Sequence, residues 1–134
     1  MEKMRSIKYL VVHCTATPQA TTIESIKNHW ANVLGWKTVG YHYIIKADGQ
    51  IVQLQPIDKP TNGVKGYNKE CVHVCYIGGM INDNRTKQQK AALTQVLTGL
   101  KQQFPTAIIQ GHRDFPGVAK ACPQFDAKNE YKNL

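Results

Sequence analysis

The chain has 134 residues and a mass of 15.1 kDa, which is enough for one domain with its own hydrophobic core. No apolar run approaches the roughly 18 residues of a transmembrane helix, so we expect no transmembrane segment. Lys and Arg outnumber Asp and Glu by 17 to 9, giving a formal net charge of +8 and a pI near 9.4. This charge suits nucleic acid, an acidic membrane surface, an anionic cell-wall polymer or simple solubility, and does not separate these four.

The cysteines and the N-terminal residues indicate the compartment. The chain has four cysteines, and two of them, Cys14 and Cys75, lie in apolar strand-like stretches. The apolar stretch 9–12 is too short for the core of a signal peptide. We therefore expect a protein made and kept in the cytoplasm, with reduced cysteines. Cys122 alone stands in a reactive setting.

The first elements in chain order are a strand and a helix. Residues 7–13, rich in β-branched side chains, predict a buried strand. Either Thr21 or Thr22 caps a helix that Gly35 ends, and the pair Thr21 and Glu24 matches a capping box.

A hairpin and a long loop follow the helix. Residues 41–46 and 51–55 predict two antiparallel strands joined by a turn at Ala47-Asp48-Gly49. Residues 56–70 form a long polar loop, and loops of that length in compact domains are often functional.

The second half of the chain predicts two more strands and two helices. Residues 71–77 indicate a buried strand, and Thr86 with Gln89 opens an amphipathic helix that Pro105 ends. A strand over 107–110 precedes a loop and a short terminal helix. Strands that alternate with helices predict a single α/β domain, residues 1–134, with a central mixed β-sheet flanked by helices.

Candidate metal ligands gather at the predicted strand ends. His13 and His112 each end a buried strand, and Cys122 follows ten residues after His112 on a loop rich in Gly and Pro. If the two strands are neighbours, both imidazoles project from one edge of the sheet and Cys122 can complete the set. Imidazole and thiolate suit zinc, and three protein ligands leave a fourth position open for water, as in catalytic zinc sites.

Each of these assignments has an alternative. A single strand-end histidine is more often a hydrogen-bonded core residue than a ligand, and three rival histidines remain: His29, His42 and His73. Of these, His42 faces the same general end and is the strongest rival. Lys120 could stabilise an oxyanion beside the metal, or be a solvated surface lysine. Tyr41 could hold or deprotonate a water molecule, or be a hydrogen-bonded sheet residue.

Several segments together resemble zinc-dependent N-acetylmuramoyl-L-alanine amidases of the phage-lysozyme and peptidoglycan-recognition-protein type, and above all phage endolysins. The matching segments cover nearly the whole chain in family order: VVHCTAT (11–17), GWKTVGYHYIIKADG (35–49), KGYN (65–68), VCYIGG (74–79), GHRD (111–114) and AKACPQFD (119–126).

The resemblance implies a reaction and a set of residues. It implies zinc held by His13, His112 and Cys122, with Tyr41 and Lys120 as the catalytic pair. It further implies hydrolysis of the amide between N-acetylmuramic acid and L-alanine of peptidoglycan. We accordingly expect a peptidoglycan-bound monomer that acts on the cell wall once it is released from the cytoplasm.

The sequence departs from the family at two positions and leaves two other functions open. Gly63 stands where many relatives have a histidine, and His73 stands where a glycine is common. A non-catalytic peptidoglycan-binding module is the alternative function, although such proteins typically lack the cysteine that is present here as Cys122. We do not expect nucleic-acid binding, because the basic residues are scattered and no nucleic-acid motif is present. Phage lysis, wall recycling and toxin roles, and the stem-peptide preference, stay open.

Overall fold

A computed structural model describes residues 5–134, so that residues 1–4 of the predicted domain lie outside the described residues. It shows one mixed five-stranded sheet in the order β3-β2-β4-β1-β5. Strands β2, β4, β1 and β5 run parallel, and β3 pairs antiparallel with β2. The predicted single α/β domain with a mixed sheet is therefore confirmed. The strands are β1 (Tyr9–Cys14), β2 (Tyr43–Ile45), β3 (Ile51–Gln53), β4 (Cys71–Tyr76) and β5 (Ile108–Gly111).

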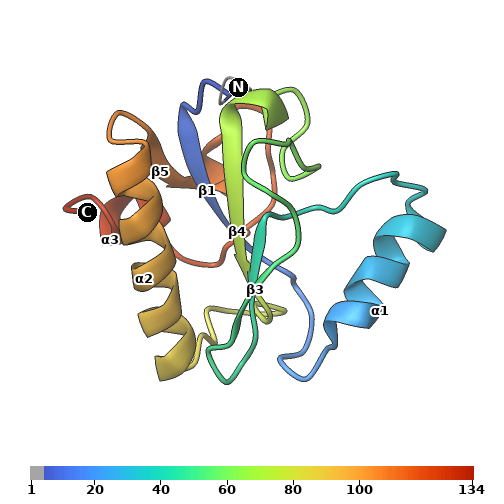
Figure 1. Cartoon of the computed structure of the whole chain (residues 1–134). Coiled ribbons are helices and arrows are strands. Elements are labelled where there is room, and N and C mark those ends of the chain that lie inside the picture. Colours follow the sequence, from blue (N-terminus) through green and yellow to red (C-terminus); the bar gives the residue numbers. More distant parts are fainter. Residues whose placement is uncertain (1–4) are drawn as a thin grey trace.

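Helices lie on both sides of the sheet (Figure 1). The longest helix, α2, packs along one side, and α1 lies on the other. The helical elements are α1 (Ile23–Asn28), its π-helical continuation η1 (His29–Val33), η2 (Asn68–Glu70), α2 (Lys87–Gln103), η3 (His112–Asp114) and α3 (Ala127–Glu130). All the predicted strands and helices are present, with both strands of the hairpin shorter than predicted.

The two helix starts test the predicted caps. At α2 the capping box is confirmed, because Thr86 Oγ1 accepts from Gln89 N at 3.0 Å and Gln89 Oε1 accepts from Thr86 N at 3.0 Å. At α1 the predicted box of Thr21 and Glu24 is wrong. Thr22 is the N-cap, and its hydroxyl accepts from Ser25 N at 3.1 Å. A hydroxyl one residue further along the chain therefore satisfies the first turn of α1.

Side chains along β1 alternate between the two faces of the sheet, and the candidate site lies on the face opposite α2. Leu10, Val12 and Cys14 belong to the hydrophobic cluster that α2 covers. Val11 belongs to a cluster on the opposite face, and His13, two residues further on, shares that face. The same alternation puts His73 of β4 on this face, because its neighbours Val72 and Val74 pack toward α2. Two fully buried histidines therefore lie between apolar clusters rather than in the main core.

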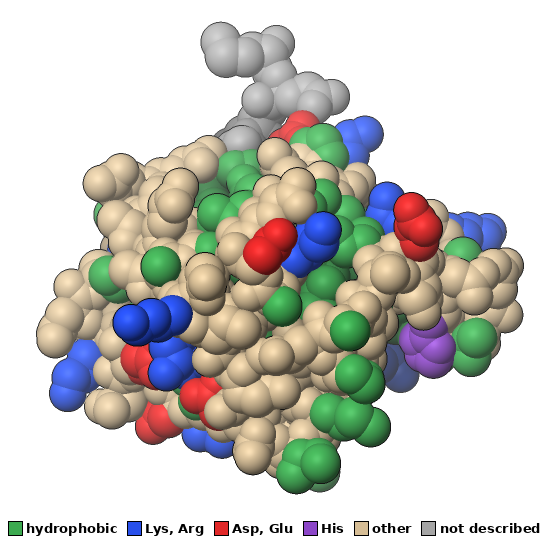
Figure 2. Space-filling model, turned by 90° about the horizontal axis from the view of Figure 1, so that it is seen from below, with side chains coloured by type: hydrophobic (Ala, Val, Ile, Leu, Met, Phe, Trp, Pro, Cys, Tyr) green, Lys and Arg blue, Asp and Glu red, His purple; other side chains and the backbone are tan. Residues whose placement is uncertain are grey.

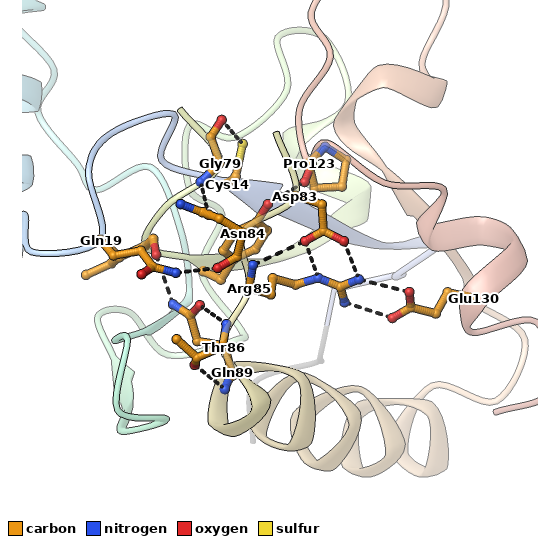
Figure 3. A network of polar contacts seen from close by, with 12 residues as sticks. Cys14, Gln19, Gly79, Asp83, Asn84, Arg85, Thr86, Gln89, Pro123 and Glu130 are labelled. Carbon is orange, nitrogen blue, oxygen red and sulfur yellow. Dashed lines mark hydrogen bonds and ion pairs between the residues drawn. The ribbon is translucent and has the colours of Figure 1, made fainter. Parts of the chain in front are cut away.

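A polar network joins the segment after β4 to the C-terminal segment (Figure 3). The Arg85 side chain is only 2% exposed and bonds Asp83 at 2.9 Å and Glu130 of α3 at 2.8 Å. Its guanidinium carbon lies 3.4 Å from the centroid of the Phe125 ring. Tyr76 at the end of β4 donates to Pro123 O at 2.7 Å. These contacts hold the segment that directly follows Cys122.

One face of the molecule carries mixed charge. In Figure 2, Lys and Arg side chains are scattered among Asp and Glu rather than gathered into one basic patch. Over residues 5–134, every helix is too short or too polar to cross a membrane.

Candidate metal centre

The register of β1 against β5 brings two histidines together. Val12 lies opposite Gly111 in this parallel pair. The next residue of each segment is a histidine, so His13 and His112 stand level just beyond the last β1–β5 pair, one residue before the end of β1. Their ring centroids are 4.9 Å apart. The condition set by the sequence, that these two strands are neighbours, is met in the sheet order.

The loop after η3 returns Cys122 to the same place. Arg113 N donates to Cys122 O at 2.9 Å, which closes the loop beside His112. Cys14 N donates to Cys122 Sγ at 3.2 Å, which fixes the sulfur at the end of β1. Gly111 permits this approach, because a Cβ there would lie 2.6 Å from Pro123 Cδ.

His13, His112 and Cys122 could hold a metal ion. One ligand atom from each of the three lies within 4.8 Å of the other two. No other group of three or more His, Cys, Asp or Glu residues in 5–134 meets this condition. Small side-chain adjustments can bring all three to one ion, because zinc bonds to such ligands are about 2.0–2.3 Å long. Two imidazoles and one thiolate match the preferences of zinc, and three protein ligands leave a coordination position for water or substrate. The donor set fits a catalytic zinc.

Burial also shifts the pKa values of the three candidate ligands when no metal is bound. Burial, reinforced by neighbouring histidines, lowers the pKa of His13 well below its ordinary value. Burial and then the charge of Lys120 lower the pKa of His112. Both rings are therefore neutral at pH 7, as metal binding requires. Interaction with the Cys14 thiol, together with burial, raises the pKa of Cys122, so a metal must displace a proton from this sulfur.

Tyr41 and Lys120 line the same cavity as the three candidate ligands. The Tyr41 ring lies 4.9 Å from the His13 ring and 5.4 Å from Trp30, and the residue is half-buried. Burial raises the pKa of the Tyr41 phenol well above its ordinary value, so the hydroxyl is protonated at neutral pH. Tyr41 can therefore hold a water molecule but is unsuited to deprotonate one. Lys120 is exposed and close enough to His112 for its charge to lower the pKa of that ring.

The cavity forms the middle of a longer cleft. Its volume is about 160 Å³, and it shares Thr15, Ala16 and Tyr41 with a hollow of about 380 Å³ beside α1 and η1. On the other side it continues into a hollow of about 440 Å³ beside the 62–68 loop. The shared lining there is Trp36, Asn62, Gly63, His112 and Lys120. A larger hollow of about 650 Å³, near the start of α1, has neither histidine nor cysteine in its lining. The cleft therefore suits an extended substrate with its reacting bond at the centre.

The three rival histidines lie outside the candidate ligand set. His29 is exposed on η1. His42 is fully buried, accepts from His73 N at 3.0 Å through Nδ1, and donates through Nε2 to Lys59 O at 2.7 Å. Both its nitrogens are used by the backbone, so His42 is a structural residue. Sequence reasoning considered His73 only as a rival ligand, whereas the structure places it in direct contact with His13. Its only sequence signal was its departure from the family pattern.

The chain is similar to a group of phage lysis proteins over nearly its whole length. It is 37% identical over 133 residues to the endolysin of Klebsiella phage KP32, covering 94% of this chain and 86% of that protein. It is 32% identical over 134 residues to the endolysin of Escherichia phage T7, covering 95% and 87%.

Solved structures agree on the fold. The amidase LysCS from Clostridium intestinale URNW superposes with a TM-score of 0.81 at 22% identity, covering 94% of this chain and 80% of that one. The Apis mellifera protein PGRP-SA superposes with a TM-score of 0.80 at 21% identity, covering 96% and 82%.

The sequence itself assigns the family. Residues 3–125 match the family described as N-acetylmuramoyl-L-alanine amidase, and the two endolysins, more than 30% identical, align with 94% and 95% of the chain. The chain therefore belongs to the N-acetylmuramoyl-L-alanine amidase family and is an amidase that acts on peptidoglycan.

Proposed function

We propose that this amidase is zinc-dependent and that His13, His112 and Cys122 hold the ion while it cleaves the bond between N-acetylmuramic acid and L-alanine. One observation carries the proposal: three suitable ligand atoms lie within 4.8 Å of one another in the middle of a cleft. A bound zinc ion would polarise the scissile carbonyl and lower the pKa of water at the open coordination position.

Tyr41 has the position and the protonation state to orient the attacking water. Its ring packs against both His13 and Trp30, which restricts the direction of the hydroxyl. A phenol that stays protonated at neutral pH can donate one hydrogen bond and accept another. We assign it the positioning of water rather than general-base catalysis.

Lys120 supplies positive charge where negative charge develops. It lines the central cavity and the adjoining hollow, on the same side as His112. An ammonium group there interacts more strongly with the tetrahedral oxyanion than with the neutral amide, so it stabilises the transition state selectively.

The unit of function is a further part of the proposal. The family match spans residues 3–125, and the segment beyond it contributes Ala127 of α3 and the following Tyr131 to the main core. We therefore propose that residues 1–134 form one amidase domain that works as a monomer on the cell wall after release from the cytoplasm.

Two measurements test the proposal. Mass spectrometry of purified peptidoglycan after digestion should find free stem peptides beginning with L-alanine and intact glycan strands. Metal analysis should find one zinc per chain, and Cys122→Ser should lose most of it. His42→Asn is the matched control and should keep its zinc, because the two nitrogens of His42 bond the backbone of His73 and Lys59 and none of the candidate ligands. Undiminished zinc in Cys122→Ser would refute the ligand assignment.

The same experiments separate the alternatives. Binding to peptidoglycan without release of stem peptides would favour the non-catalytic binding module. Duplex DNA titrated at increasing salt tests whether the net charge of +8 serves nucleic acid. We expect only weak, salt-sensitive binding there, because the basic residues are scattered along the sequence and are mixed with acidic ones on the face seen in Figure 2.

A further inference from the structure

The two positions at which the sequence departs from the family lie in direct contact. A Cβ added to Gly63 would overlap the imidazole of His73, well inside the 3.0 Å that real Cβ atoms keep, with Nδ1 as the nearest atom. Gly63 belongs to the loop that lines the cleft, whereas His73 lies in the centre of β4. The His73 imidazole therefore occupies the space that any side chain at position 63 would need.

The His73 imidazole faces the metal centre from behind. It is fully buried, so it cannot contact a substrate in the cleft. Its Nδ1 lies 2.8 Å from Nε2 of His13, and its Nε2 lies 2.9 Å from Oδ1 of Asn68. The resulting chain of hydrogen bonds runs from the 62–68 loop through β4 to the candidate ligand on β1.

Starting from the backbone N–H of Val64, the donor and the acceptor of each hydrogen bond in this series can be assigned in turn. Val64 N–H donates to Asn68 Oδ1 at 2.8 Å, which identifies this atom as the amide oxygen. An amide oxygen only accepts, so His73 Nε2 carries a proton and donates to it. The ring is buried without a counter-charge and is neutral, so its Nδ1 is an acceptor. Nε2 of His13 must then be the donor, which leaves Nδ1 of His13 with a free lone pair.

We propose that His73 is a positioning residue: through this chain it selects the tautomer and orientation in which His13 presents Nδ1 to the metal, and Gly63 provides the space it occupies. Hydrogen bonds from outside the ligand set commonly orient a ligating histidine, and their loss typically weakens metal binding about 10–100-fold. The inference rests on the proposed metal site, although its first test needs no metal.

The first test reads the tautomers in the metal-free protein. In ¹⁵N-labelled protein, long-range ¹H–¹⁵N correlations distinguish Nδ1–H from Nε2–H in each histidine ring. We expect Nε2–H for both His13 and His73. Asn68→Leu removes the acceptor at the start of this series of hydrogen bonds. In this variant the spectrum of His13 should shift or become a mixture of tautomers. An Nδ1–H tautomer of His13 in the wild type would overturn the proposal.

The second test measures zinc affinity by competition with a chelator. His73→Phe removes the acceptor for His13 and should weaken zinc binding about 10–100-fold. His73→Asn, whose Oδ1 can replace Nδ1 as an acceptor, should recover most of the loss. His29→Phe makes the same change at an exposed histidine of η1, outside the candidate ligand set, and should leave the affinity near wild type. Equal effects of His73→Phe and His73→Asn would indicate a packing role only and overturn the proposal.

A third test examines the contact between the two departures. Gly63→Ala should displace the His73 ring and weaken zinc binding, whereas in a His73→Gly background the same change should cost little further. Additive losses in this double-mutant cycle would contradict the coupling. If the wild type binds no zinc at all, the proposed metal site fails, while the tautomers of His13 and His73 still decide the positioning role.

Discussion

Gly111→Ala tests how the sheet edge holds the ligand loop. Gly111 has a φ of −85°, which any residue can adopt, so the substitution causes no backbone strain. Its effect is steric, because the new Cβ would lie 2.6 Å from Pro123 Cδ, where ordinary contact begins at 3.4 Å. The gap must open by roughly 0.8 Å (3.4 − 2.6), and Pro123 directly follows the candidate ligand Cys122.

The size of the effect follows from this overlap. Overpacking of a closely packed site costs about 1–3 kcal/mol of the free energy of unfolding. A shift of this size is about a third of a zinc–sulfur bond of about 2.3 Å, so we also expect zinc affinity to fall about 10–100-fold. Urea unfolding of the metal-free protein measures the first quantity, and chelator competition measures the second.

Gly99→Ala is the matched control. Gly99 lies in α2, where an added Cβ would meet nothing within 4 Å. Alanine favours the helix, so this variant should gain about 0.5–1 kcal/mol and keep its zinc affinity. Wild-type stability and zinc affinity in Gly111→Ala would refute the argument that this glycine allows Cys122 to reach the two histidines.

Four further predictions concern catalysis, acid stability and the thiols. Lys120→Ala should keep zinc and fold but lose about 10²–10³-fold in turnover on peptidoglycan, and a wild-type rate would return Lys120 to a solvated surface role. Tyr41→Phe should likewise keep zinc and lose activity, whereas full activity would leave the tyrosine a packing residue only. Hydrogen bonds from Arg85 lower the pKa of Glu130 from 4.5, so this pair stabilises the fold at neutral pH and the contribution is lost as the pH falls through the lowered value. Between pH 7 and pH 3 the unfolding free energy of the wild type should therefore fall more than that of Glu130→Gln, and equal falls would contradict the role of the pair. All four cysteines are free thiols in the structure; they should react with a thiol reagent after denaturation and zinc chelation without reductant, and fewer than four would count against a cytoplasmic protein.

Local patterns were sufficient for most of the elements. The capping box at Thr86 and the Asp-Gly turn of the hairpin act within a few residues, so they can be read directly from the sequence. The same reasoning left the cap of α1 open between Thr21 and Thr22 and wrongly predicted a capping box from Thr21, because the two residues are adjacent and only the entry of the chain into the helix selects Thr22. It also could not predict the change from α-helix to π-helix at His29.

The candidate ligands were identified from strand ends and family segments, and their meeting depended on the tertiary structure. His13 and His112 stand level only because β1 and β5 are neighbours in a particular register, which no local pattern specifies. His42, the strongest rival by sequence, is excluded because backbone groups from β4 and the 56–70 loop use both its nitrogens.

His73 and Gly63 show the limit most clearly. In the sequence they are two unrelated departures, ten residues apart. In the fold the His73 ring occupies the space beside Gly63 and forms a hydrogen bond with His13, the candidate ligand on β1. The sequence by itself determined which residue types were available for zinc chemistry, because type and local spacing are properties of the chain. Tertiary structure alone decided which nitrogen of His13 is free to bind a metal, because that depends on hydrogen bonds among three segments brought together by the sheet.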